Sequence, residues 1–263
     1  MAFPRPPSPS AILIAACLSL ANEAIAAEGN SKCRFDLIGN ATTVAVTDAR
    51  SFRLADGREV KLAGIDVPGG RQAAMTRAAL ENLVLGKDLV VRAPSDGADR
   101  YGRVAAFAFV NGSETPVQYN LLALGQARVS AQVEDKACSM ALLAEEKRAR
   151  EGRIGLWADP GYAVRAAEDG PAIRPQRGRF SVAEGRVVSV RDSGGTIYVN
   201  FGRRWSEALT VTILKRHERS FVAAGIEPRN LQGRAVRIRG YVDVRNGPMI
   251  EATRPQQIEI AAR

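Results

Sequence analysis

The chain has 263 residues, of which 46% are hydrophobic, so its length and composition suit two ordinary folded domains and argue against wholesale disorder. The formal net charge is +9, and the basic excess lies in the C-terminal part. Residues 161–263 hold 18 Lys and Arg against 10 Asp and Glu, whereas residues 1–160 hold 19 against 18. This asymmetry favours an anionic partner.

The first 27 residues have the features of a signal peptide. Arg5 supplies a positive charge, residues 11–21 are apolar, and Ala24-Ile25-Ala26 places small residues where signal peptidase reads. We therefore expect cleavage near residue 27 and a periplasmic or secreted protein. Two alternatives stay open: a buried N-terminal helix, or a lipoprotein with a lipid anchor at Cys17, which ends a passable lipobox. No later segment is long and apolar enough to span a bilayer.

Residues 34–162 alternate between strand and helix patterns. Strands are expected at 43–47, 51–54, 59–65, 88–92 and 104–109, and helices at 72–85, 117–124 and 139–151. In the first helix, Met75, Ala79 and Leu83 are the apolar residues at helical spacing. Five strands wrapped by helices predict a mainly β (α+β) fold, an OB-type five-stranded barrel with added helices.

A second β-rich block follows a polar segment with Gly and Pro. We interpret residues 163–178 as a linker and residues 179–263 as a second domain. Strands are expected at 180–191, 196–201, 208–215, 234–244 and 249–253, with a short helix at 219–224. Three strands, a helix and two strands predict a smaller OB-like β domain.

The cysteines predict one disulfide. If Cys17 leaves with the signal peptide, Cys33 and Cys138 remain, and two cysteines in an oxidising compartment usually pair. Two separate buried thiols are the alternative. A zinc site is excluded because the only histidine, His217, has no further cysteine to join it. His217 lies in a basic stretch and shows no catalytic partner.

Alternating residues suggest a binding face on the second domain. Arg237, Arg239 and Tyr241 alternate with apolar residues along one predicted strand, and Tyr198 alternates likewise along another. Arginine and tyrosine on an open OB face hold single-stranded nucleic acid by phosphate contact and stacking. An ordinary solvated face is the alternative. The first interpretation makes these four residues candidate nucleic-acid contacts.

Four segments of the first domain occur in a characteristic order. They are Ser51–Pro68 (SFRLADGREVKLAGIDVP), Asp99–Arg103 (DRYGR), Asn120–Val129 (NLLALGQARV) and a helix that runs into Gly155–Trp157 (GLW). With them, residues 40–160 resemble the staphylococcal nuclease (thermonuclease) family, which implies a nuclease-like barrel. The second domain resembles the C-terminal segment that follows such barrels in some exported bacterial proteins.

The resemblance implies calcium-dependent phosphodiester hydrolysis in the family. Aspartates of a DGDT turn and a DTPE turn hold the calcium ion, the glutamate of DTPE acts as base, and two arginines hold the phosphate. This set suits an anionic substrate, which needs a cation and fixed guanidinium donors to stabilise developing charge. The attacking water also needs a nearby carboxylate.

This chain departs from that pattern at three positions. Asp66 is retained as the only carboxylate metal ligand, and Arg103 is retained as a phosphate contact. Lys61 replaces the other arginine and cannot make its bidentate fork. Arg50 stands where a metal-binding aspartate is expected, and Gly69 replaces the glutamate. One carboxylate holds a hard dication poorly, so we expect no cofactor, or Ca²⁺ if the site is rearranged.

Two further expectations concern charged side chains. Arg50 should point into the vacant cation site and pair with Asp66, because a buried carboxylate without calcium needs another positive partner. Glu145 and Glu146, beside basic residues in a helix, should form an exposed salt-bridged face rather than a displaced acid–base pair.

Three functions remain open. The first is an exported nuclease-like protein with a degenerate site that binds nucleic acid or another polyanion with little or no hydrolysis. The second is an active calcium-dependent phosphodiesterase with a rearranged site. The third is an envelope protein-interaction module. Cleavage that depends on a divalent ion would select the second, and salt-sensitive binding without cleavage would select the first.

Overall fold

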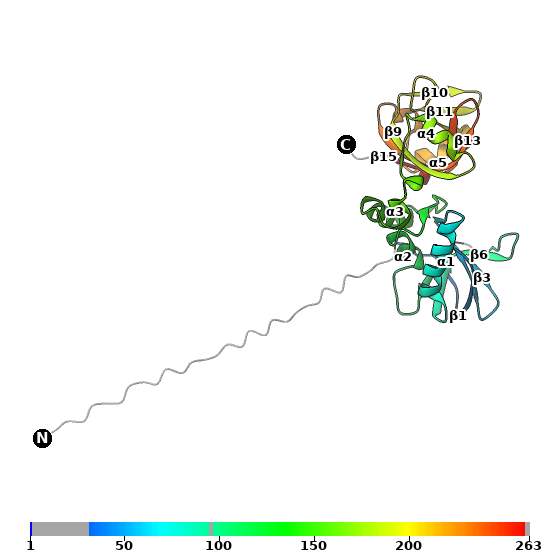
Figure 1. Ribbon diagram of the computed structural model, residues 1–263, viewed down its shortest axis with the longest axis vertical. Coiled ribbons are helices and arrows are strands. Elements are labelled where there is room, and N and C mark those ends of the chain that lie inside the picture. The colour runs from blue at the N-terminus through cyan, green and yellow to red at the C-terminus, as the bar shows by residue number, and fades with distance from the viewer. Residues whose placement is uncertain (2–31, 95–96, 261–263) are drawn as a thin grey trace.

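Two β-rich lobes make up the computed structural model of the protein (Figure 1). The structure describes residue 1, residues 32–94 and residues 97–260. The predicted signal peptide and the Cys17 lipobox lie outside the described residues, apart from Met1. Within the described part of the chain, no helix is long and apolar enough to cross a membrane.

The first lobe is a closed five-stranded barrel, as the sequence predicts. Its strand order is β1-β2-β3-β6-β5, and β3 runs parallel to β6. The strands are β1 (Asp36–Asp48), β2 (Ser51–Leu54), β3 (Glu59–Leu62), β5 (Asp88–Ala93) and β6 (Arg103–Val110). Gly57, at φ 87°, makes the tight turn between β2 and β3. Fully buried apolar side chains such as Phe52, Leu89 and Phe107 fill the barrel.

Three helices cover this barrel. They are α1 (Arg71–Val84), α2 (Val117–Ala123) and α3 (Lys136–Glu151), with a small two-stranded sheet of β4 (Ile65–Asp66) and β7 (Arg128–Val129). The expected apolar face of α1 is correct only in part: Ala79 and Leu83 are partly buried against the core, but Met75 is exposed. The buried residues are instead Gln72, Thr76, Leu80 and Val84. The Thr76 hydroxyl donates to the Gln126 carbonyl at 2.7 Å, so polar contacts as well as apolar packing fix the helix.

The predicted disulfide between Cys33 and Cys138 is confirmed. Their Cα atoms lie 4.4 Å apart across a sequence separation of 105 residues. Cys138 lies in the first turn of α3, where its backbone N–H donates to the N-cap carboxylate of Asp135 at 2.7 Å. The bond therefore ties the start of the barrel to the start of its last helix.

We expect the Cys33→Ala/Cys138→Ala variant to lose about 2–5 kcal/mol of unfolding free energy, because the cross-link closes a long loop in the unfolded chain. Urea denaturation of oxidised wild type and variant measures this difference. Reductant should lower the stability of the wild type to that of the variant and leave the variant unchanged. Equal stability of oxidised and reduced wild type would contradict the prediction.

The second lobe repeats the strand order of the first. Its strands are β9 (Phe180–Arg186), β10 (Ser189–Ser193), β11 (Thr196–Asn200), β12 (Thr210–Leu214), β13 (Ala235–Val244) and β14 (Pro248–Glu251). Strand β12 runs parallel to β14, β14 pairs antiparallel with β13, and β13 pairs with β9. Because β9 and β10 are consecutive along the chain, they take the place of one interrupted first strand. Helix α5 (Lys215–Ala223) follows β12, as expected.

The segment expected as a linker has structure of its own. It holds β8 (Arg165–Ala166), α4 (Gly170–Ile173) and η3 (Arg174–Gln176), and β8 pairs with β9. Ala167 is fully buried in the core of the second lobe. The remaining short elements are η1 (Gly155–Ala158), η2 (Pro160–Tyr162), η4 (Pro228–Leu231), η5 (Pro255–Gln257) and β15 (Ile258–Ile260). Residues 163–178 therefore belong with the second lobe.

Candidate functional site

The arginine of the DRYGR turn is held by carboxylates at the start of β6. Arg103 donates to Asp99 Oδ2 from Nε at 3.1 Å and from Nη2 at 2.9 Å, and its Nη1 lies 3.5 Å from Asp48 Oδ2. Asp99 also accepts the backbone N–H of Tyr101 at 2.9 Å. These hydrogen bonds from Arg103 and the turn lower the pKa of Asp99 to about 2. Asp99 therefore closes the turn and orients the arginine.

Two more cations gather near Arg103. Lys61 lies on β3, next to β6, and burial together with the charges of Arg50 and Arg103 lowers the pKa of its ammonium. The Arg50 Nη1 donates to the backbone carbonyl of Ile65 at 3.4 Å. Arg50 and Lys61 line a cleft of 340 Å³. We call Arg50, Lys61 and Arg103 the cation cluster. Arg103 is paired with Asp99 and Asp48, whereas Arg50 and Lys61 have no carboxylate within 4 Å in the described part of the chain and are the charges most open to an anion.

Asp66, the retained metal-ligand position, belongs to a different set of contacts. Its Oδ2 accepts from Arg128 Nη2 at 2.7 Å, and its Oδ1 lies 3.3 Å from the Tyr241 hydroxyl, which donates to it. The expected pairing of Asp66 with Arg50 is wrong: across residues 32–94 and 97–260, the ion pair of Asp66 within 4 Å is the one with Arg128. Burial and the charge of Asp66 raise the pKa of Tyr241.

Arg128 joins the two lobes through this contact. Its side chain is buried, and its Nη1 donates to the Phe180 carbonyl at 2.9 Å. The guanidinium also lies over the rings of Phe180 and Tyr162, at 5.0 and 5.6 Å from their centroids. Such cation–π contacts strengthen when they are desolvated. Asp66 is therefore neutralised by a guanidinium that the second lobe holds in place.

These residues do not fit a calcium ion. Calcium takes six to eight oxygen ligands, usually several of them carboxylates. Asp66 is already paired with Arg128, and Arg50 adds positive charge beside it. At Gly69 the chain offers only open space, with nothing within 4 Å of where a Cβ would lie. Among the described residues, no cluster of three His, Cys, Asp or Glu side chains is suited to a metal.

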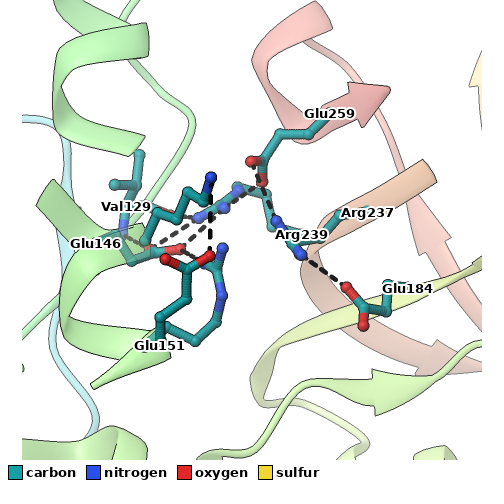
Figure 2. A network of polar contacts seen from close by, with 9 residues as sticks. Val129, Glu146, Glu151, Glu184, Arg237, Arg239 and Glu259 are labelled. Carbon is teal, nitrogen blue, oxygen red and sulfur yellow. Dashed lines mark hydrogen bonds and ion pairs between the residues drawn. The ribbon is translucent and has the colours of Figure 1, made fainter. Parts of the chain in front are cut away.

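A second ion network fastens the lobes together (Figure 2). Glu146 on α3 and Arg239 on β13 are both fully buried, and their side chains meet at 2.9 and 3.0 Å. Glu146 Oε2 also accepts the Val129 N–H at 2.6 Å, and Arg239 donates to the Val129 carbonyl at 3.0 Å. Glu259 accepts from Arg239 at 2.5 Å. The network thus compensates both buried charges, although the Nε of Arg239 has no partner among the described residues.

This network corrects two expectations. Glu146 is buried in the interface rather than exposed, whereas Glu145 forms the expected salt bridge with Arg148 at 2.8 Å, although its own side chain is only 19% exposed. Burial alone would raise the pKa of Glu146, but the charge and hydrogen bonds of Arg239 hold it below its usual range. The same pair raises the pKa of Arg239, against the effect of its burial. Arg239 therefore cannot contact a nucleic acid.

The other residues of the expected binding face are also accounted for. Arg237 pairs with Glu184 of β9 at 2.7 Å, whereas Arg239 and Tyr241 contact Glu146 and Asp66 of the first lobe. Tyr198 lies on β11, which β12 and β14 separate from β13 in the sheet. His217 on α5 accepts from the Nε of the neighbouring Arg216 at 3.2 Å. The four candidate residues therefore do not form one open face.

Arg128 and Glu146 are site residues that the sequence analysis missed. For Glu146 a signal was present, because Ser139, Leu142, Glu146 and Ala149 follow one another at helical spacing and all are buried. A carboxylate in such a stripe indicates a buried partner. For Arg128 no comparable signal exists, since its contacts to Asp66 and Phe180 depend on how the lobes meet.

Comparison with known proteins agrees with this geometry. Residues 59–159, from β3 to the segment after η1, match the family model described as staphylococcal nuclease homologue. A search of the curated proteins finds no match. The match covers the DRYGR turn, α1 to α3 and the GLW segment, all of which belong to the first lobe. Residues 59–159 are therefore similar to staphylococcal nuclease homologues, a likeness that suggests a nuclease-type or nucleic-acid-binding function for this domain.

Proposed function

We propose that this protein is an exported nuclease-like protein that binds nucleic acid or another polyanion at the cation cluster, with little or no hydrolysis. One observation carries the proposal: the retained metal-ligand position, Asp66, is neutralised by Arg128. Arg50, Lys61 and Arg103 keep their positive charge near the family's phosphate positions. The site thus favours binding of an anion over its cleavage.

Two chemical arguments support the absence of hydrolysis. Gly69 removes the general base, a contribution of about 10²–10⁴-fold to the rate in other enzymes. The charge of Arg50 repels a divalent ion, and a calcium ion would have to displace Arg128 from Asp66 at 2.7 Å. Losses within one site are not independent, so these effects do not simply multiply.

Location outside the cytoplasm is part of the proposal. The sequence begins with a signal-peptide pattern, and the Cys33–Cys138 disulfide suits an oxidising compartment. Disulfides persist in the periplasm and in secreted proteins and are rare in the cytosol. The proposed location of the protein is therefore the periplasm or the outside of the cell.

The test uses the protein from residue 28 onward with labelled single-stranded DNA and RNA, in calcium, magnesium or chelator. We expect binding that weakens steeply with salt, because phosphate contacts release counterions, and no cleavage that depends on a divalent ion. Lys61→Gln should weaken binding. It should also reduce the slope of the logarithm of the binding constant against the logarithm of the salt concentration by about one, because one phosphate contact is lost. Lys87→Gln, an exposed lysine in the turn after α1, is the matched control and should bind as the wild type does.

Two results would select the other functions. Robust cleavage that chelator and Asp66→Ala both abolish would establish a rearranged calcium-dependent phosphodiesterase. If the protein neither binds nor cleaves nucleic acid, the remaining function is that of a protein-interaction module. Equal weakening by Lys61→Gln and Lys87→Gln would show that binding is not centred on the cation cluster.

A further inference from the structure

A cleft of 680 Å³ lies between the two lobes, and Asp66 forms part of its wall. The first lobe contributes the turn from Asp66 to Gly70, and the second contributes residues 178–182 and Tyr241. The connecting segment adds Tyr162 and Arg165. This volume lies in the range of small-molecule sites, about 300–1,000 Å³.

The charge of this cleft is positive. Arg165 and Arg179 line it, and within the described ranges neither has a carboxylate within 4 Å. Asp66 is neutralised by Arg128 at 2.7 Å, whereas the Asp159 carboxylate accepts only the Gly161 N–H and keeps its charge. Three arginines against two aspartates leave the lining with a net charge of +1. Arg165 also donates to the Gly161 carbonyl at 3.2 Å, and Arg179 is the arginine of the lining most open to an anion.

The N-terminus of α1 opens on the same cleft. The N-cap of this 14-residue helix is Gly70, which supplies no side-chain cap, and the first turn holds no acidic residue. Gly69 and Gly70 both line the cleft, and neither position has an atom within 4 Å of where a Cβ would lie. The first N–H groups of a helix have no intrahelical partner and carry partial positive charge. They suit an anion that approaches over these two glycines.

A hydroxyl at the cleft wall offers a further donor. Ser181 lines the cleft with only 7% of its surface exposed, and its hydroxyl makes no hydrogen bond to any residue the structure describes. This hydroxyl is therefore free to donate to an anion in the cleft.

We propose that this cleft binds a small phosphomonoester. Its phosphate group lies between Arg165, Arg179 and the α1 N-terminus, and its organic part lies against Tyr162 and Tyr241. A tetrahedral dianion with three oxygens uses donors that converge from several sides better than a carboxylate does. Tyr241 is 59% exposed and offers its ring to a planar group. Arg50, Lys61 and Arg103 do not line this cleft, so the site does not depend on polyanion binding at the cation cluster, although the segment from Ile65 to Gly69 borders both.

Calorimetry with phenyl phosphate, inorganic phosphate and phenol tests this site on the protein from residue 28 onward. We expect saturable binding of phenyl phosphate, weaker binding of inorganic phosphate and none of phenol. Arg165→Gln and Arg179→Gln should each weaken binding about tenfold, since each removes a charge-assisted hydrogen bond. Arg219→Gln, an exposed arginine on α5 outside the cleft, should leave it unchanged.

Gly69 offers a matched pair of variants, because a side chain there meets open space and its φ is not left-handed. Gly69→Glu should abolish phenyl phosphate binding by placing a negative charge at the helix N-terminus, whereas Gly69→Gln, of the same size, should retain it. A nucleoside monophosphate and a 5′-phosphorylated oligonucleotide then distinguish a free ligand from a chain end. Binding of either supports the site, and competition with phenyl phosphate identifies the source.

Three results would overturn this proposal. One is no saturable binding of phenyl phosphate at millimolar concentration. Another is equal weakening by Arg179→Gln and Arg219→Gln, and the third is equal loss with Gly69→Glu and Gly69→Gln. Lys61→Gln separates this site from the proposed function, since it should leave the phenyl phosphate affinity unchanged whether or not polyanions bind.

Discussion

Replacing Glu146 by Gln should destabilise the protein by about 3 kcal/mol, because it removes the charge that compensates Arg239 in a fully buried position. Arg239 would keep Glu259 at 2.5 Å, which places the cost at the lower end of the range for a broken buried pair. Chemical denaturation, followed separately by signals from each lobe, measures the effect. We also expect the lobes to separate at lower denaturant concentration than in the wild type.

Glu145→Gln is the matched control. Glu145 is the neighbour of Glu146, but it is partly exposed, at 19% of its side chain, and its partner Arg148 is 72% exposed, so solvent screens this pair. Exposed ion pairs contribute about 0–1 kcal/mol, so this variant should be nearly as stable as the wild type. The double variant Glu146→Leu/Arg239→Met should recover only part of the loss, because apolar residues replace the buried pair but leave the Val129 N–H and carbonyl without these partners. Equal effects of Glu145→Gln and Glu146→Gln would contradict the interface.

The pH dependence of stability follows from the same pair. The pKa of Glu146 is lower in the folded protein than its usual value near 4.3, so its contribution is fully present above that value. The contribution is lost as the pH falls through the folded pKa of Glu146. The Glu146→Gln variant lacks this group and should show a smaller fall in stability in acid. Urea midpoints measured from neutral pH to pH 3 compare the two.

Local sequence patterns were sufficient to predict both β-rich lobes. Strand alternation, the Asp56-Gly57 turn and helical spacing depend on neighbours in the chain, so these features can be interpreted one segment at a time. The first barrel and its three helices follow from them, whereas the Cys33–Cys138 disulfide was predicted from the signal-peptide pattern and the cysteine count. The buried face of α1 was missed because Gln72 and Thr76 are buried through hydrogen bonds to Gln126 rather than through apolarity.

The arrangement of the lobes could not be predicted in the same way. Arg239 and Tyr241 alternate with apolar residues whether their side of β13 faces solvent or another lobe. What decides their role is Glu146 and Asp66, which are 93 and 175 residues away along the chain. A polar residue on a strand therefore indicates an exposed face only when no charged residue of another lobe covers it. For the same reason, the sequence suggested Arg50 and not Arg128 as the ion-pair partner of Asp66.

Restoring the nuclease pattern should require release of Asp66 as well as the missing side chains. The variant Arg50→Asp/Lys61→Arg/Gly69→Glu supplies a second carboxylate ligand, the phosphate fork and the base. Asp66 would nevertheless stay bound to Arg128 at 2.7 Å and to Tyr241. We expect this triple variant to bind calcium only weakly and to cleave single-stranded DNA slowly.

Adding Arg128→Gln and Tyr241→Phe to the triple variant should raise calcium-dependent cleavage at least about 100-fold above the triple variant, the scale that one properly placed catalytic group contributes. Without its guanidinium partner, buried Asp66 gains a calcium ion as its compensating charge. Calorimetry with calcium and cleavage of labelled DNA, each repeated with chelator, measure the two effects. Near-ultraviolet circular dichroism shows that the lobes remain folded.

The contribution of Asp66 can be isolated within this series. Asp66→Asn in the five-fold variant should abolish both calcium binding and cleavage, because the amide keeps the shape but loses the charge. Tyr241→Phe added alone to the triple variant removes one hydrogen bond and leaves the Arg128 ion pair, so it should produce little gain. If the triple variant already cleaves as fast as the five-fold one, Arg128 does not withhold Asp66 from calcium. The loss of activity would then lie in Arg50, Lys61 and Gly69 alone.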